Sequence, residues 1–317
     1  MCCPYSLLRV KLKEGNNLMR KYAIPNMRLG ATSFLLHETY VPAVRFAAER
    51  CDDVALLLVE PGERNEYLAT PGEIAEIGRI IAGESATLHV HLPTDADFDT
   101  WQGARSMIGK IRRVAELTGP LDPHSFVLHV DFPSLHGTGG EPSAEQQEWT
   151  AEALREIAAC LPAPERLAVE NLETYAPSFW DRWLAGTPYS RCLDVGHIWK
   201  DGGDPAPVLA AWLPRVRVIH LHGLEPRESE ADAAKPQGQQ RTPEKLAERN
   251  LSRLFGPRPR DHKSLRLMPP EFVDDVMHPL WKTGFSGVLN LEVFSVEDFT
   301  ASHAVLMHSW ERYAASF

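Results

Sequence analysis

The sequence predicts an α/β fold, and within that class a (β/α)8 TIM barrel. Eight short runs of apolar and β-branched residues alternate with eight helix-like segments between residues 28 and 315. Strands that are apolar almost throughout are typical of a parallel sheet that helices cover on its outer face. Eight such units fit a closed barrel, and no glycine-rich dinucleotide fingerprint follows any of the strands, which disfavours an open doubly wound sheet.

The predicted elements follow one another in regular order. The strands are 28–34, 54–60, 86–92, 125–131, 166–172, 190–197, 216–223 and 287–294. The helices between and after them are 40–50, 71–83, 100–118, 143–160, 176–185, 205–213, 269–283 and 297–315. The fourth helix has a clear start signal, because Ser143 is followed three residues later by Gln146, the spacing of a capping box.

Two segments depart from this rhythm. Residues 1–26 carry no clear period, and we expect them to be an N-terminal extension that is disordered, with Met27 as an alternative start of the chain. Residues 27–317 would then form a single barrel domain. Residues 225–260 are polar, rich in proline and long for a loop after a strand. Loops of this length are usually functional or disordered, so this insertion is either a lid over the substrate or a floppy excursion.

The composition is that of a soluble globular protein, with 44% hydrophobic and 24% charged residues among 317. No apolar run reaches the 18 residues of a membrane span, and the first residues lack the features of a signal peptide. Five scattered cysteines show no disulfide pattern, which predicts a reducing, cytoplasmic environment. The net charge of −10 disfavours DNA as a partner, because DNA-binding proteins usually present a basic surface.

Titratable residues gather where the predicted strands end, which is where barrels of this type build their active sites. These residues are Glu60, His89, His91, His129, Asp131, Glu170, Asp194, His197, His220, His222 and Glu292, followed past the insertion by Asp261 and His262, and the polar Asn171 stands beside Glu170. A single histidine in such a place is more often a hydrogen-bonded core residue than a ligand. A set of this size is costly to bury unless something pairs it, and divalent cations pair carboxylates and imidazoles economically.

The donor types narrow the choice of metal. Imidazole and carboxylate without thiolate suit zinc, manganese, iron or cobalt better than magnesium or calcium. The number of candidate ligands is sufficient for two or three divalent ions, with zinc preferred. Neighbouring ions can activate a water molecule and hold the attacking and leaving oxygens of a phosphoryl group. Such a cluster would suit the metal-dependent hydrolysis of a phosphodiester.

Short motifs add a resemblance that spans residues 28 to about 310. "HLP" at 91–93, "VENL" at 169–172, "CLDVGH" at 192–197, "IHLHG" at 219–223 and "LEVF" at 291–294 resemble the xylose-isomerase-like barrels, and with "DH" at 261–262 the apurinic endonuclease family 2. Two departures stand out. Asp261 and His262 are adjacent where the endonucleases have a residue between them, and His222 replaces another polar residue.

The resemblance implies three metal sites. One would be held by His91, His129 and Glu170, and Glu170 would bridge to a second site. The second would be completed by Asp194, His220 and Glu292. A third would use His197, Asp261 and His262.

A closer resemblance within this superfamily indicates a substrate. The combination of "LGATSF", "VALLLVE", "DHKSL" and "GVLNLEVFS" is similar to the cobamide-remodelling phosphodiesterases, which implies cleavage in the nucleotide loop of a corrinoid. Glu170, Asp194 and Glu292 would be the catalytic residues. We expect His89, His222, Glu60 and Asn171 to contact the substrate or to support the ligands.

Three other functions remain open from the sequence. A sugar or sugar-acid isomerase or epimerase would need one metal among Glu170, Asp194, His220 and Glu292, and its two glutamates could act as paired acid and base. An abasic-site endonuclease is disfavoured by the acidic charge. A binding protein without catalytic activity is the third alternative, since a fold alone does not decide function.

Overall fold

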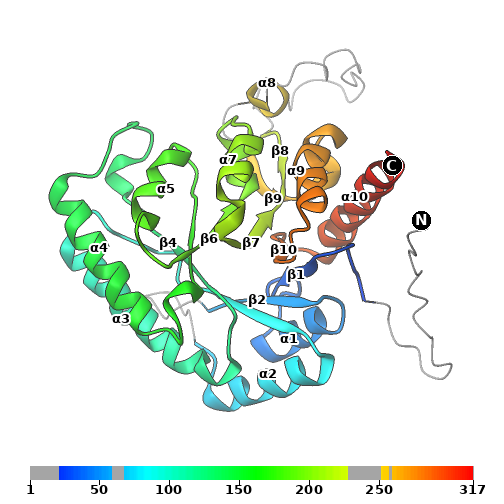
Figure 1. The fold of residues 1–317 in the computed structure, drawn as a ribbon. Coiled ribbons are helices and arrows are strands. Elements are labelled where there is room, and N and C mark those ends of the chain that lie inside the picture. The colour runs from blue at the N-terminus through cyan, green and yellow to red at the C-terminus, as the bar shows by residue number, and fades with distance from the viewer. Residues whose placement is uncertain (1–20, 59–67, 228–250, 257–258, 317) are drawn as a thin grey trace, which may run out of the picture.

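The computed structural model describes residues 21–58, 68–227, 251–256 and 259–316, and its centre is a closed barrel of eight parallel strands (Figure 1). The barrel strands are β1 (Arg28–Thr32), β2 (Asp53–Leu57), β3 (Thr87–His91), β4 (Phe126–His129), β5 (Leu167–Glu170), β6 (Ser190–Asp194), β7 (Val216–Leu221) and β10 (Val288–Leu291). They pair in the order β1-β10-β7-β6-β5-β4-β3-β2. The predicted (β/α)8 barrel is therefore confirmed.

Helices surround the strands on the outside (Figure 1). They are α1 (Tyr40–Ala48), α2 (Pro71–Glu84), α3 (Trp101–Thr118), α4 (Ala144–Ala159), α5 (Pro177–Leu184), α6 (Val195–Lys200), α7 (Pro205–Trp212), α8 (Leu251–Phe255), α9 (Pro270–Thr283) and α10 (Val296–Ala314). The predicted capping box of α4 is present, because the Gln146 backbone N–H donates to Ser143 Oγ at 3.1 Å. Among the described residues, no helix combines the length and apolarity that a membrane crossing would require.

One predicted element was wrong in its second half. The sequence predicts a strand over 190–197, but β6 ends at Asp194 and α6 begins at Val195. The Asp194 carboxylate caps this helix by accepting the His197 backbone N–H at 2.6 Å. Gly196 allows the sharp entry, since a Cβ at this position would lie 2.0 Å from the His222 ring.

The inside of the barrel is layered. Successive inward-facing residues of a strand are two apart, so each strand contributes to more than one layer. A lower apolar layer consists of Val127, Ala168, Cys192, Val218 and Val288. Two residues further along the same five strands stand His129, Glu170, Asp194, His220 and Asn290. Because inward-facing residues are two apart, the apolar layer is followed directly by a polar layer at the carboxyl ends of the strands.

The ends of the predicted insertion form a small sheet of their own. β8 (Gly223–Glu225) pairs antiparallel with β9 (Arg260–Lys263). Gly223 allows the close approach, because a Cβ there would lie 2.3 Å from the Ser264 carbonyl oxygen. Residues 228–250 of the insertion and 1–20 of the predicted extension lie outside the described residues. Residues 21–26 pack on the barrel, with the Tyr22 backbone N–H donating to the Arg50 carbonyl at 2.7 Å.

Candidate metal centre

Three carboxylates converge on one imidazole at the carboxyl ends of the strands. His220 Nδ1, from β7, lies 2.8 Å from Glu170 Oε1 and 3.0 Å from Glu292 Oε2. The same nitrogen lies 3.9 Å from Asp194 Oδ2. β5, β6 and β7 carry Glu170, Asp194 and His220, and Glu292 directly follows β10. Four residues that lie between positions 170 and 292 of the sequence therefore form one cluster.

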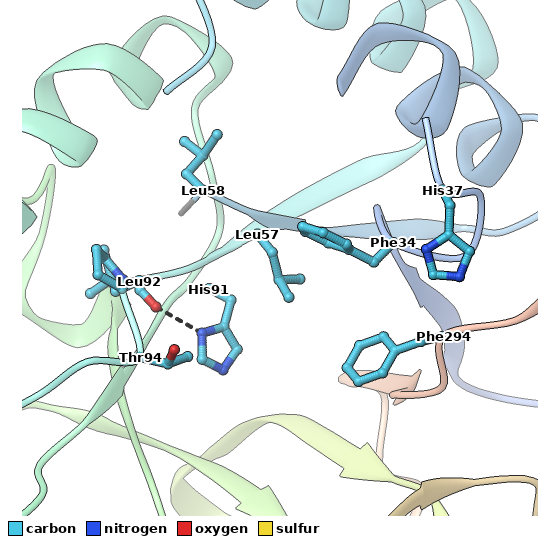
Figure 2. A pocket seen from close by; sticks show the side chains of 9 residues that line it. Phe34, His37, Leu57, Leu58, His91, Leu92, Thr94 and Phe294 are labelled. Atoms are coloured by element: carbon cyan, nitrogen blue, oxygen red, sulfur yellow. Dashed lines mark hydrogen bonds between the residues drawn. The ribbon is translucent and has the colours of Figure 1, made fainter. Parts of the chain in front are cut away.

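Two further histidines contact the other side of Glu170. His129 Nε2 lies 3.0 Å and His91 Nε2 3.3 Å from Glu170 Oε2. His91 is held by a hydrogen bond from its Nδ1 to the Leu92 carbonyl oxygen at 2.9 Å, drawn in Figure 2. Both oxygens of Glu170 are thus occupied, one by His220 and the other by this pair.

The electrostatics of the cluster keep its glutamates ionised. Burial raises the pKa of Glu170 and Glu292, but the charge of His220 and hydrogen bonds from neighbouring histidines outweigh burial and hold both pKa values well below their usual range. Burial lowers the pKa of His220, while Cys192, Glu292 and Glu170 raise it by more, to well above its usual value. Imidazolium groups therefore supply the positive charge when no metal is bound.

The donors fit a divalent cation. Asp194 Oδ2 and the Nε2 atoms of His220 and His222 are buried without a hydrogen-bond partner among the described residues. In two overlapping groups, His91, His220 and Glu292 and then His91, His129 and Glu170, the potential ligand atoms lie within 4.8 Å of one another. No lysine or arginine forms an ion pair with Glu170, Asp194 or Glu292 among the described residues. A metal ion would satisfy these buried groups.

A second histidine cluster adjoins the first. Potential ligand atoms of His197, His222 and His262 lie within 4.8 Å of one another. His262 Nε2 lies 3.6 Å from Glu292 Oε2, and its backbone N–H donates to His222 Nδ1 at 3.0 Å. His222 Nε2 lies 3.4 Å from Asp194 Oδ1. The two clusters therefore share Asp194 and Glu292.

Asp261 faces a cation other than a metal. Its carboxylate forms an ion pair with Lys200, and Lys200 Nζ also donates to Glu173 Oε1 at 2.6 Å. Glu173 in turn lies 3.4 Å from His197 Nε2, and although burial raises its pKa, His197 and Lys200 lower it to about 2. Neither Glu173 nor Lys200 was singled out from the sequence. Glu173 could have been found from the sequence, because it stands two residues beyond Asn171 and continues the polar end of the fifth strand.

Two supporting residues have defined places. Asn171 forms two hydrogen bonds with the backbone of Asp194, from its Nδ2 to the carbonyl at 2.7 Å and from the Asp194 N–H to its Oδ1 at 2.9 Å. His89 lies below the rim, fully buried, with Nδ1 2.5 Å from Asp53 Oδ1, so it supports the barrel interior and does not face the opening. Glu60 lies outside the described residues.

An apolar cavity opens beside the centre. It has a volume of about 310 Å³ and is lined by Phe34, His37, Leu57, Leu58, His91, Leu92, Pro93, Thr94 and Phe294. Figure 2 shows Phe34 and Phe294 on one side of this cavity and His91 with Thr94 on the other. Phe294 also stacks on His262, with ring centroids 5.0 Å apart. His91 therefore forms a wall shared by the polar centre and the apolar cavity.

Comparisons with known proteins give the fold. No family model and no curated protein sequence matches this chain. A D-tagatose 3-epimerase-like protein is similar in structure, with a TM-score of 0.63 and 16% identity over 92% of this chain and 99% of that one. An L-ribulose 3-epimerase has a TM-score of 0.60 and 13% identity over 92% and 96% of the two chains. A xylose isomerase domain protein from Planctomyces limnophilus has a TM-score of 0.59 and 10% identity over 90% and 97%.

The fold is that of the xylose-isomerase-like barrels. The prediction of a phosphodiester hydrolase acting on a corrinoid was wrong, because sugar epimerases are similar to this chain in structure, among them a 3-keto-D-glucoside 4-epimerase from E. coli and a D-psicose 3-epimerase. The physical reason for the error is that a rim of histidines and carboxylates fits more than one metal-dependent reaction, and the fold alone does not decide among them. In the structure part of that rim already has other partners, as Asp261 does in Lys200.

Proposed function

We propose that this protein is a metal-dependent isomerase or epimerase that acts on a sugar or a sugar derivative. The observation that carries the proposal is the approach of Glu170 and Glu292 to the same His220 nitrogen, at 2.8 and 3.0 Å. Two ionised carboxylates, one at the end of β5 and one directly after β10, are suited to moving a proton on and off a carbon atom between them. The epimerases among the similar structures support this choice over hydrolysis.

Glu170, Asp194, His220 and Glu292 would hold one divalent ion, and manganese, cobalt, zinc and iron all suit a set of three carboxylates and one imidazole. When bound, such an ion polarises a carbonyl group and makes the neighbouring C–H bond more acidic. His129 donates a hydrogen bond to Glu170, His91 Nε2 lies 3.3 Å from the same oxygen, and the two rings orient the carboxylate. His197 and His262 lie beside the centre, where they would donate hydrogen bonds to the hydroxyl groups of a substrate.

The two glutamates divide the proton transfer. A carboxylate with a lowered pKa is ionised at neutral pH, so either glutamate is ready to accept a proton from the carbon next to the carbonyl. The other then returns a proton to that carbon from the opposite face for epimerisation, or to the neighbouring carbon or oxygen for isomerisation. The asymmetric contacts favour Glu292 as the more mobile group, since Glu170 is fixed by three histidines.

The test is exchange of substrate hydrogen with solvent. The purified protein, supplied with Mn²⁺, Co²⁺ or Zn²⁺, is incubated in D₂O with a panel of ketohexoses, ketopentoses, aldoses and a 3-keto-glucoside, and the sugars are followed by NMR. We expect deuterium at the carbon next to the carbonyl of at least one sugar, together with its epimer or isomer. The Glu170→Gln variant is expected to give neither. Absence of exchange with the whole panel in the metal-loaded protein would refute the proposal.

A further inference from the structure

A second cavity lies at the opposite end of the barrel, where the strands begin. It has a volume of about 670 Å³ and is lined by Arg28, His124, Ala210, Leu213, Pro214, Val216, Arg217, Thr283, Gly284, Phe285, Ser286 and Gly287. Arg28 is the first residue of β1 and Arg217 the second residue of β7, and β10 pairs between these two strands. The lining therefore contains two guanidinium groups and no carboxylate among the described residues. We call this the floor cavity.

Neither arginine has partners for all its donors among the residues that the structure describes. Arg28 Nη1 donates to Thr87 Oγ1 at 2.9 Å. Arg217 donates from Nε to Ser190 Oγ at 3.1 Å and from Nη1 to the His124 carbonyl oxygen at 3.2 Å. A guanidinium carries five N–H donors, so these neutral acceptors leave part of each fork directed at no described partner. Neither side chain forms an ion pair with a carboxylate that the structure describes.

Asp53, which Thr87 links to Arg28, already has other partners. Asp53 is fully buried, and its carboxylate accepts hydrogen bonds from His89 at 2.5 Å, from His124 at 2.8 Å and from Thr87. Thr87 bridges Arg28 to Asp53, but its hydroxyl keeps the two charges from meeting directly. The contrast with Arg215 is clear, because that residue donates to the carbonyl oxygens of Leu184 and Thr187, at 2.7 Å each, and to that of Tyr189.

We propose that the floor cavity binds a small molecule carrying a phosphate or carboxylate group, at a site separate from the metal centre. The planar fork of a guanidinium matches the oxygens of these groups with two parallel hydrogen bonds. The cavity is large enough for an organic body besides the charged group. The C-terminal ends of α7 and α9 border it, and their partial negative charge weakens the attraction without cancelling two full positive charges.

The test is a titration of the protein with two probes, inorganic phosphate and malonate, followed by calorimetry at constant ionic strength set with sodium chloride. The wild type is first dialysed to remove metal. An anion then cannot bind to a metal ion at the candidate metal centre and contribute to the measured heat. We expect saturable binding of at least one probe, and its preference assigns the charged group as phosphate or carboxylate. Arg28→Gln and Arg217→Gln should each weaken that binding at least about tenfold, the loss of a charge-assisted hydrogen bond.

Two sets of variants keep the result interpretable. Arg112→Gln removes one positive charge from an exposed side chain outside the cavity and should leave the affinity unchanged. If a glutamine variant loses its far-ultraviolet circular dichroism, Arg28→Lys and Arg217→Lys replace it, and these should bind more weakly because they keep the charge but lose the fork. Binding that survives in every floor variant, or no binding of either probe at millimolar concentration, would overturn the proposal.

Discussion

The two ends of the barrel carry groups of opposite charge. At the carboxyl ends, Glu170, Asp194 and Glu292 are buried around imidazoles and have no lysine or arginine as ion-pair partner among the described residues. At the amino ends, Arg28 and Arg217 line a cavity in which no carboxylate is described. One end has negative charge suited to a cation, and the other has positive charge suited to an anion. The comparison shows that the two ends of one barrel can be suited to ligands of opposite charge.

The layer between the two ends explains how both can exist. Val127, Ala168, Cys192, Val218 and Val288 fill the barrel on the side of β4 to β7 and β10 and separate the two polar groups. On the side of β2 and β3 the separation is different, because Asp53 and His89 are buried there as a hydrogen-bonded pair. His89 lies next to His220, with ring centroids 6.1 Å apart. The barrel interior is therefore apolar on the side of β4 to β7 and β10, and polar on the side of β2 and β3.

The largest effect is expected on activity, when a glutamate at the carboxyl ends of the strands is replaced. Glu170→Gln and Glu292→Gln should each lower kcat by about 10²–10⁴-fold, the contribution of a positioned acid or base, while phosphate or malonate binding at the floor cavity stays unchanged. The measurement is the initial rate with the sugar found by deuterium exchange. Glu297→Gln is the matched control, since this residue lies on the same face with its side chain 79% exposed. A rate within twofold of wild type for either buried variant would show that the glutamates are not the acid and base.

The next effect tests the polar side of the interior. Asp53→Asn removes the charge that two histidines and Thr87 share, and we expect the free energy of unfolding to fall by about 3 kcal/mol at pH 7. Burial raises the Asp53 pKa, but His89 and His124 hold it well below its usual value of 3.8. The stabilisation is thus complete above pH 3.8 and is lost as the pH falls below it. Urea denaturation at pH 7 and pH 3 should show a smaller difference between wild type and variant at the lower pH.

Adding a divalent metal should stabilise the folded protein through the carboxyl ends of the strands only. A divalent ion at one hundred times its Kd should raise the free energy of unfolding by about 2.7 kcal/mol, because it binds the folded chain only. The affinity should fall with falling pH, since the pKa of His220 is raised and a proton must leave before the imidazole can bind a metal. Thermal unfolding with and without Mn²⁺ at pH 6 and pH 8 measures both. A shift that persists in a Glu170→Ala, Asp194→Ala double variant would place the ion elsewhere.

The smallest expected effect concerns the support of Asp194. Asn171→Leu removes both hydrogen bonds to the Asp194 backbone and should lower the free energy of unfolding by about 1–3 kcal/mol. The floor cavity should not respond, so its probe affinity serves as the internal control. Asn171→Asp distinguishes the two bonds, because a carboxylate keeps the acceptor and loses the donor. Equal stability of all three proteins would contradict a supporting role for this side chain.

The sequence predicted the barrel and the rim because both depend on local patterns. Apolar runs of strand length, helix starts such as Ser143, and titratable residues at strand ends are all legible along the chain. Contacts between distant strands are not. The Asp53–His89–His124 group joins positions 36 and 71 residues apart, and the pairing of Lys200 with Asp261 spans 61. The number of metal sites was also beyond the sequence, since it depends on which acids already have a cation.

The short sheet formed by β8 and β9 affects how the folded chains behave toward one another in concentrated solution. A closed barrel has no free strand edge, so β8 and β9 offer the only unpaired edges among the named strands that the structure describes. An open edge is a template on which a second chain can add a strand and begin to aggregate. Here the edges are three and four residues long and carry Glu225, Arg260, Asp261 and Lys263. Charge and brevity at this one place protect the protein from edge-to-edge association.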